Sequence, residues 1–103
     1  MLGMPKIYEY FGLIFFFFSN EHEPIHVHVI KGGYQTVFEL IIQDGELVEI
    51  RQRIKKGSLP LSSKDSQEAE EFVRAYYKKI IEKWKNFFLL KKRVRCTSVT
   101  KRI

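Results

Sequence analysis

Three runs of alternating apolar residues, separated by two glycine-containing turns, constrain the fold of this chain more than any other feature of its sequence. The first turn, Gly32-Gly33, is a two-residue turn of the primed type, which joins antiparallel strands. We therefore expect a hairpin between residues 26–31 and 34–42. The length of the turn determines which residues face each other: Ile30 opposite Gln35, His28 opposite Val37 and His26 opposite Glu39. The alternate positions form one apolar face that must be turned toward the core: Val27, Val29, Thr36, Phe38, Leu40 and Ile42.

The second turn contains Asp44-Gly45 and allows two registers. A two-residue loop would place Glu49 and Arg51 on the core face, which is costly for charged side chains. A three-residue loop over 43–45, with Gly45 left-handed, shifts the register by one residue and keeps the core face apolar. We therefore predict the three-residue loop, with these opposed pairs: Leu40 with Val48, Phe38 with Ile50, Glu39 with Glu49 and Val37 with Arg51.

An apolar segment precedes the hairpins. Residues 13–18 have no polar face, so we expect a strand that is central in the sheet or covered by a partner chain. Residues 7–10 are predicted to form a shorter strand ahead of it. The segment 19–24 carries turn residues and leads into the strand at 25–30.

A long amphipathic helix follows the sheet. Asp65 is predicted to cap it, with Glu68 as the reciprocal partner of a capping box. Apolar residues then recur at three- and four-residue steps over about six turns, which is the pattern of a helix with one buried face. We expect this stripe to lie across the apolar face of the sheet: Ala69, Phe72, Val73, Tyr76, Ile80, Trp84, Phe87 and Phe88.

The predicted elements describe one α+β domain over residues 1–103: a four- or five-stranded antiparallel meander with one long C-terminal helix packed on one face. With 45% hydrophobic residues the chain is apolar enough to fold. The tail alternates weakly and is either an extra edge strand or a loose arm. We expect these bounds: sheet about 7–54, basic connection 55–64, helix about 65–90 and basic tail 91–103.

The sequence also favours a cytoplasmic protein. Cys96 is the single cysteine, which excludes an internal disulfide and is typical of a reducing compartment. The longest apolar run, 11–18, is far shorter than the ~20 residues that cross a bilayer, and no signal-peptide cleavage site follows it. We therefore expect no membrane partner. Met1 and Met4 are both candidate start sites, because the patterned sequence opens at Pro5.

The net charge of +6 is divided unevenly along the chain. Residues 1–50 hold two basic and seven acidic residues, or −5, whereas residues 51–103 hold sixteen basic and five acidic residues, or +11. From Lys83 onward there are eight basic residues and no acid. Such a segment is typical of a protein with a nucleic-acid or acidic protein partner, but it also serves solubility and stabilises a helix C-terminus. Charge alone does not separate these interpretations.

All three histidines lie within seven residues, at His22, His26 and His28. His26 and His28 are two apart on a strand and point to one face, which the predicted register turns away from the helix. Two carboxylates directly opposed on that face repel each other unless a cation lies nearby. The predicted register collects these charged residues beside the histidines: Glu39, Glu49 and Arg51.

Three interpretations fit this group of side chains. The first is a salt-bridge network around a protonated His26 or Arg51. In the second, a divalent transition metal binds His26, His28 and a carboxylate, with His22 as a further ligand, and no other cofactor is expected. The third is metal-independent RNA cleavage, in which His26 or His28 moves the proton and Glu39 orients the ring. The cations that would hold phosphate are these: Arg51, Arg53, Lys55 and Lys56.

Other signals for chemistry are weak. No Gly-rich phosphate loop, paired-cysteine motif or HExxH motif is present. Cys96 lies among basic residues, but we expect an ordinary thiol because no histidine is close in sequence. Aromatic residues that could stack bases are few: Tyr8 and Tyr10 are available, whereas Tyr34 falls on the predicted core side.

Five stretches of the sequence carry a family resemblance: PKIYEYFG at 5–12, FFFFSNEHEPIHVHV at 15–29, EEFV at 70–73, IIEKW at 80–84 and TKRI at 100–103. Together they resemble the domain-of-unknown-function family 4160, a group of small bacterial and archaeal proteins. The resemblance implies no assigned activity. It does imply a neighbouring gene for a second small protein, as in a two-gene module of the toxin–antitoxin kind. The family-like positions of the motif are His22, Pro24, His26 and His28.

Two function hypotheses follow. The leading one is an RNA-directed protein, in its sharpest form ribonuclease-like, that serves as one component of such a module. The alternative is a non-enzymatic protein-binding or homodimeric module, whose histidines form a structural polar network or a metal site. In that version the strand Phe15–Phe18 supplies the dimer interface.

Overall fold

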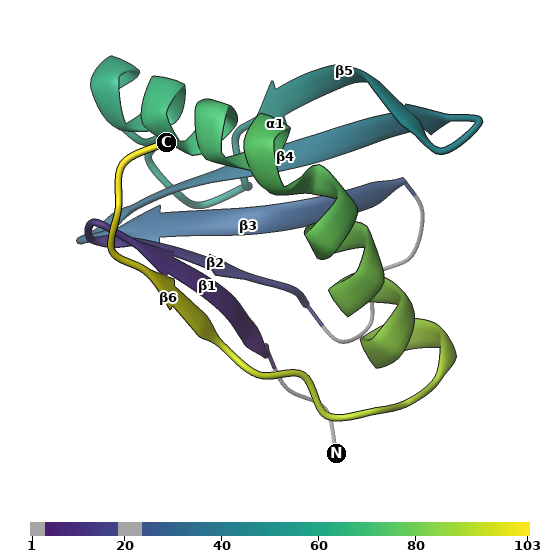
Figure 1. Cartoon of the computed structure of the whole chain (residues 1–103). Helices are drawn as coiled ribbons and strands as arrows, with labels where there is room; N and C mark the ends of the chain where they lie inside the picture. The colour runs from purple at the N-terminus through teal and green to yellow at the C-terminus, as the bar shows by residue number, and fades with distance from the viewer. Residues whose placement is uncertain (1–3, 19–23) are drawn as a thin grey trace.

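Six strands form one sheet in the order β5-β4-β3-β2-β1-β6, and one long helix crosses one face of it (Figure 1). The computed structural model describes residues 4–18 and 24–103. The first five strands form an antiparallel meander, and β6 joins β1 in parallel. The fold is α+β, as predicted, with six strands in place of four or five. The strands have these bounds: β1 Lys6–Tyr10, β2 Leu13–Phe16, β3 Ile25–Lys31, β4 Tyr34–Gln43, β5 Glu46–Arg53 and β6 Thr97–Val99.

The hairpin between β3 and β4 has the predicted register. Its turn, Gly32-Gly33, pairs Lys31 with Tyr34, and the other pairs follow along the strands. Gly32 has a φ of 61°, which a primed turn requires at this position and which glycine adopts without steric cost. The predicted pairs are confirmed: Ile30 with Gln35, His28 with Val37 and His26 with Glu39.

The hairpin between β4 and β5 differs from the prediction. Its loop has two residues, Asp44-Gly45, rather than three. Val48 is instead an extra residue within β5, a β-bulge, because the pairs on either side of it are shifted by one residue: Ile42 with Leu47, and Ile41 with Glu49.

Like the predicted longer loop, the bulge keeps charged side chains of β5 off the core face. It leaves Ile50 in the core and turns Glu49 and Arg51 to the opposite face, and it also packs Leu47 against the core. A three-residue loop would have turned Val48 inward and Leu47 outward; with the bulge Leu47 packs against the core and Val48 is 55% exposed. The predicted pairs across this hairpin are therefore wrong by two residues, and the observed ones are Leu40 with Ile50, Phe38 with Gln52, Glu39 with Arg51 and Val37 with Arg53.

The helix α1 spans Ser63–Trp84 and continues into a π-helical turn, η1, at Lys85–Leu89. Its cap is Ser62, whose hydroxyl accepts a hydrogen bond from the backbone N–H of Asp65 at 3.1 Å. The predicted cap at Asp65 is therefore wrong by one turn. No helix in the described residues is long and apolar enough to span a membrane.

The core lies between α1 and the sheet. The predicted apolar stripe of the helix is confirmed, since Phe72 and Ile80 are fully buried and the partly exposed Phe87 and Phe88 pack against the core. Phe72 is the centre of an aromatic group, with its ring centroid 4.4–5.2 Å from each of its neighbours: Tyr8, Tyr10, Phe15 and Tyr76.

Three tyrosines differ from the prediction in their exposure to solvent. Tyr8 and Tyr10 are buried in this aromatic group and cannot stack on bases. Tyr34, predicted on the core side, is 50% exposed and lies at the turn end of the β3–β4 hairpin. The strand β2, predicted to be central or covered by a partner chain, is central: both of its edges are hydrogen-bonded, to β1 and to β3.

The tail is an edge strand rather than a loose arm. β6 pairs with β1 through Tyr8 opposite Thr97 and Tyr10 opposite Val99. The ammonium group of Lys83, near the end of α1, stabilises the pairing of β6 with β1. It donates hydrogen bonds to three acceptors: the carbonyl oxygen of Ile7 at 3.0 Å, that of Arg95 at 2.6 Å and the hydroxyl of Thr97 at 3.1 Å.

Candidate functional site

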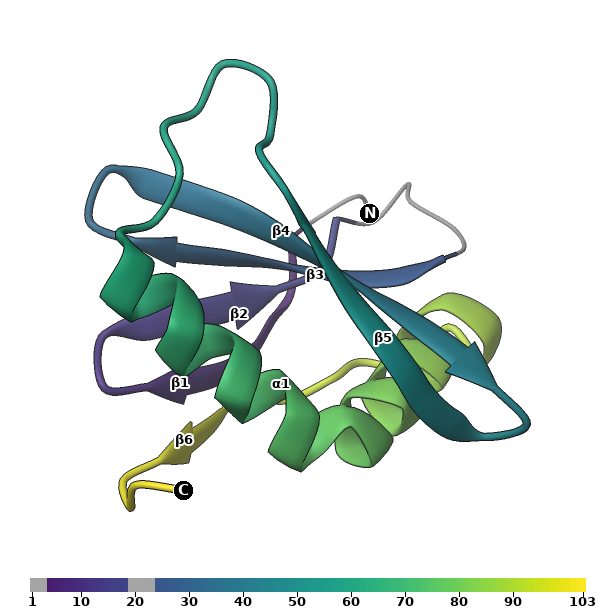
Figure 2. The same cartoon turned by 90° about the horizontal axis from the view of Figure 1, so that it is seen from above.

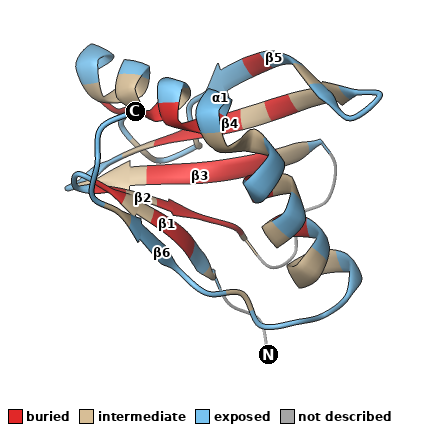
Figure 3. Ribbon diagram, in the orientation of Figure 1, coloured by how far each residue is buried: buried red, intermediate tan, exposed pale blue. Residues whose placement is uncertain are grey.

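The predicted site lies on the face of the sheet opposite α1, which we call the outer face. Two rows of side chains run across adjacent strands on this face. The first row consists of Phe16, His28, Val37 and Arg53, and the second of His26, Glu39 and Arg51. Strand β3 is buried on both faces over 26–29, although α1 covers only one of them (Figure 3). The outer face is thus partly closed over the histidines.

His28 is packed like a core residue. Its side chain is 1% exposed, and its ring centroid lies 5.3 Å from that of Phe16 and 3.8 Å from that of Phe18. The amide nitrogen of Gln35 donates a hydrogen bond of 3.0 Å to Nδ1 of His28. Since Nδ1 accepts, a neutral His28 carries its proton on Nε2.

His26 is held in the other tautomer. Its Nδ1 donates a 2.7 Å hydrogen bond to the carbonyl oxygen of Pro24, so a neutral ring has its lone pair on Nε2. The ring is 9% exposed, and its centroid lies 5.6 Å from that of His28. Of the two histidines, His26 has the orientation expected of a base or a metal ligand, because a backbone carbonyl fixes its second nitrogen.

The carboxylates of the outer face do not oppose each other. Glu39 faces Arg51 across the strands, and its carboxylate accepts a 2.8 Å hydrogen bond from Nε of Arg53. Glu49 accepts one of 3.0 Å from Nε of Arg51. This hydrogen bond, followed by the charge of Glu49, raises the pKa of the Arg51 guanidinium. The predicted Glu39–Glu49 repulsion is therefore wrong, because the bulge at Val48 moves Glu49 away.

The predicted phosphate-binding cations are largely engaged within the protein. Arg51 and Arg53 form the ion pairs just described. Nζ of Lys55 lies 4.7 Å from the centroid of Phe18, a cation–π contact, whereas Lys56 is exposed. Figure 2 shows the connection from β5 to α1 looping out on the side of the sheet away from the helix.

The metal hypothesis falls partly outside the described residues, because His22 lies in the segment 19–23. Within residues 4–18 and 24–103, no group of three or more His, Cys, Asp or Glu side chains lies close enough to hold a metal ion. A site on His26 would need ligands from segment 19–23 or from elsewhere.

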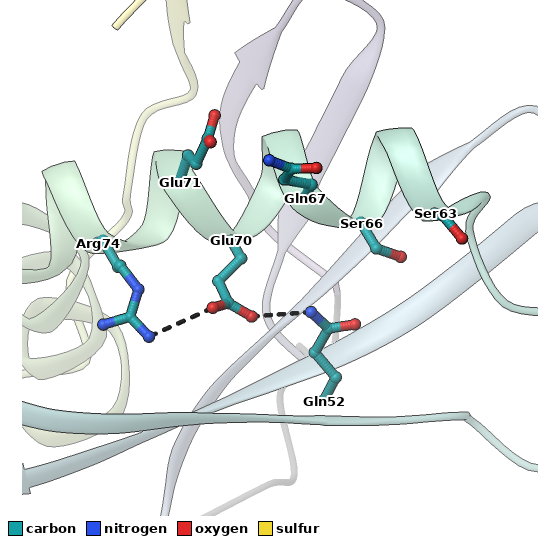
Figure 4. A pocket seen from close by; sticks show the side chains of 7 residues that line it. All are labelled: Gln52, Ser63, Ser66, Gln67, Glu70, Glu71 and Arg74. Atoms are coloured by element: carbon teal, nitrogen blue, oxygen red, sulfur yellow. Dashed lines mark hydrogen bonds and ion pairs between the residues drawn. The ribbon is translucent and has the colours of Figure 1, made fainter.

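A polar pocket of about 490 Å³ lies between β5 and the first half of α1 (Figure 4). Its central residue is Glu70, which accepts hydrogen bonds from Gln52 at 2.8 Å and from Arg74 at 3.2 Å. The hydrogen-bonding capacity of Glu70 is thus used within the protein, by Gln52 and Arg74. The residues that line it are Gln52, Ser63, Ser66, Gln67, Glu70, Glu71 and Arg74.

A different set of cations is open to solvent. We call Lys85, Lys91, Lys92, Arg93 and Arg95 the basic C-terminal segment, and all of them are exposed. In the described part of the chain none of them forms an ion pair. The sequence pointed to this segment through its charge, but it could not show that these cations stay unpaired.

Cys96 behaves as the ordinary thiol that the sequence predicts. It is exposed and not part of a disulfide. Partial burial of the thiol, together with the charge of Glu9, raises the pKa of Cys96 despite the opposing charges of Lys83 and Lys6. A raised pKa reduces the thiolate fraction at neutral pH, which is the reactive form.

Comparison with known proteins agrees with the resemblance seen in the sequence. No curated protein and no solved structure matches the chain. One family model does, over residues 12–85, a range that includes the histidine strand β3 and the whole of α1 but not β1, β6 or most of the basic C-terminal segment. The chain therefore belongs to the family described as Domain of unknown function (DUF4160).

Proposed function

We propose that this protein binds RNA, and that the basic C-terminal segment holds the phosphate backbone. One observation carries the proposal: from residue 83 onward the chain has eight basic residues and no acid, and all of them except the partly buried Lys83 are exposed. Lys83 is hydrogen-bonded within the protein and Arg102 is paired with Glu68, whereas the five cations of the basic C-terminal segment form no ion pair in the described part of the chain. Cations without protein partners attract a polyanion and release its counterions, which is the main source of affinity in nucleic-acid binding.

The shape of the segment favours a single strand over a duplex. A helix that reads duplex DNA must enter the major groove, but α1 packs one face along the sheet (Figure 1). The helix ends at Leu89, Lys91 turns the chain with a φ of 55°, and the rest of the basic C-terminal segment runs back toward β6. Cations spaced along an extended chain follow the backbone of a flexible strand.

The proposal is tested by two variants that carry the same loss of charge on different surfaces. The first replaces Lys91, Lys92, Arg93 and Arg95 with Gln. The matched control replaces the predicted phosphate-binding set of the outer face with Gln: Arg51, Arg53, Lys55 and Lys56. Binding of a labelled 12-nucleotide RNA is followed by fluorescence anisotropy at several salt concentrations.

We expect the C-terminal variant to bind at least tenfold more weakly near 0.1 M salt. Because each phosphate contact on a single strand contributes about −0.7 to the slope of log K against log salt, losing four contacts flattens that slope by about 3. The control should stay within about threefold of the wild type. The proposal fails if the C-terminal variant binds RNA as tightly as the wild type, or if the wild type does not bind RNA at 50 mM salt. If the wild type binds an acidic peptide more tightly than RNA, the protein-partner alternative is favoured.

RNA cleavage is a second candidate, supported by a single contact. The hydrogen bond from His26 Nδ1 to Pro24 leaves the lone pair on Nε2, as a general base requires. A labelled RNA incubated with the wild type and with His26→Ala separates binding from cleavage. Growth inhibition on expression, expected of the toxic member of a two-gene module, is measured with the same two proteins. Intact RNA and equal growth for both would leave binding as the function.

A further inference from the structure

An apolar cleft with two lysines at its rim lies beside the basic C-terminal segment. It has a volume of about 420 Å³ and is formed where the second half of α1 meets the start of β3 and the end of β4. Figure 2 shows the last turns of the helix and the β4–β5 turn at the same end of the molecule. The residues that line the cleft are Ile25, Ile42, Gly45, Lys78, Ile81 and Lys85.

Apolar and charged groups are separated within the cleft. Ile25, Ile42 and Ile81 are half-buried, so apolar surface remains open. Lys78 and Lys85 are exposed and seven residues apart. Seven residues are almost two turns, so both lysines lie on one side of the helix, about 10 Å apart along its axis, with Ile81 between them.

One wall of the cleft is held in place by a hydrogen bond. The hydroxyl of Tyr77 donates to the carboxylate of Glu46 at 3.0 Å, which ties the β4–β5 turn to the helix. Glu46 and Tyr77 are the chain neighbours of the lining residues Gly45 and Lys78. The hydrogen bond therefore fixes the spacing of the two walls, and it engages the acid next to the cleft, which would otherwise oppose an anionic ligand.

We infer that this cleft takes one base of the bound RNA, with the neighbouring phosphates on Lys78 and Lys85. The inference rests on the proposed function and adds a place where a base, and not only the backbone, is bound. The flat face of a nucleobase is apolar enough to lie against isoleucine side chains once it leaves the stack. The volume lies within the range of sites that hold small ligands. Lys85 belongs to both surfaces, so one strand can run from the cleft onto the basic C-terminal segment.

The test uses a decauridine RNA and an abasic oligomer with the same number of phosphates. Both bind the basic C-terminal segment, but only decauridine can place a base in the cleft. We expect the wild type to bind decauridine about tenfold more tightly than the abasic oligomer, since burying about 55 Å² of apolar surface in the cleft is enough for a tenfold change in affinity.

Ile81→Ser removes apolar surface from the cleft without changing charge. It should reduce the preference for decauridine to about twofold and leave the affinity for the abasic oligomer unchanged. Ala75→Ser, at an exposed position of the same helix outside the cleft, is the matched control and should keep the full preference. Ile42→Ser is the second cleft variant, and circular dichroism identifies variants that fold.

Equal binding of the two oligomers by the wild type, or an unchanged preference in a folded cleft variant, would overturn this inference and leave RNA binding intact. If neither oligomer binds at 50 mM salt, the proposed function itself fails. The two failures are therefore distinguishable.

Discussion

The outer face of the sheet and the basic C-terminal segment are both rich in cations, but the fold uses them differently. On the outer face Arg53 is paired with Glu39, Arg51 with Glu49, and Lys55 lies over Phe18. In the C-terminal segment the cations are exposed and have no acidic partner among the described residues.

This comparison shows that residue type alone does not identify which surface is open to a ligand. The outer face holds histidines, two glutamates and arginines, which is the composition of a catalytic site. Its contacts, however, are those of a network that the protein completes for itself, with one histidine nearly as buried as the core valines. The C-terminal segment has no such motif, yet its positive charges have no acidic partner among the described residues and are open to an anionic ligand.

The largest expected effect concerns stability on the outer face. His28→Ala removes a fully buried ring from between Phe16 and Phe18 and leaves the amide of Gln35 without its acceptor. We expect the free energy of unfolding to fall by about 3 kcal/mol, as for other large-to-small changes at buried sites. Urea denaturation measures it. Lys92→Ala in the C-terminal segment should change it by less than about 0.5 kcal/mol. Equal effects in the two variants would contradict the comparison.

Lys83, which links the end of α1 to β1 and to the C-terminal tail, should show the next largest effect on stability. Lys83→Met keeps the length of the side chain but removes its three hydrogen bonds to Ile7, Arg95 and Thr97. We expect a loss of about 2 kcal/mol and faster amide hydrogen exchange in β6, with β4 unchanged. Lys79→Met, one turn earlier on the exposed side of α1, is the control. Unchanged exchange in β6 would show that the strand holds without Lys83.

Lys83 also predicts a dependence of stability on pH. Burial lowers the pKa of its ammonium group from the ordinary 10.5, more than the nearby Cys96 raises it. Just below pH 10.5 the Lys83 side chain therefore binds more protons in the unfolded chain than in the folded chain, so its contribution to the free energy of unfolding rises with pH in that window. The slope should be smaller in Lys83→Met, as measured by urea denaturation between pH 8.5 and 10.5. An identical slope in both proteins would contradict the lowered pKa.

A smaller effect is expected for the ion pair of the outer face. Glu39→Gln breaks the pair with Arg53, both members of which are partly exposed. Exposed pairs contribute about 0–1 kcal/mol, so stability should change by less than that. RNA affinity should rise by no more than about threefold, because one cation is released on a surface that the proposal does not use. A tenfold rise would move the binding surface to the outer face.

The smallest expected effect is that of a divalent metal. If the contacts of His26 and His28 are structural, one equivalent of Zn²⁺ should leave the imidazole NMR signals of both residues in place. The protein for this titration is purified without chelator. Joint shifts of the two signals at micromolar Zn²⁺ would replace the structural interpretation by a metal site, and activity assays would then include the metal.

The sequence predicted the features that depend on neighbouring residues. The β3–β4 register follows from a two-glycine turn, and the buried stripe of α1 follows from periodicity, so both were correct. The position of His26 and His28 on one face away from the helix follows from alternation along a strand. It was predicted correctly for the same reason.

Features that depend on distant parts of the chain required the tertiary structure. A longer loop and a bulge at Val48 both keep Glu49 out of the core, but the longer loop turns Val48 inward whereas the bulge turns Leu47 inward. The three-residue strand β6 is too short to show a pattern and forms because β1 and Lys83 provide partners.

The sequence by itself therefore determined the elements, the faces of the central hairpin and the excess of positive charge toward the C-terminus. The tertiary structure decided which of those charges are neutralised within the protein. The physical reason is that an ion pair depends on a few ångströms between side chains from different strands. A loop one residue shorter than predicted and a one-residue bulge together exchange Glu49 for Arg51 opposite Glu39.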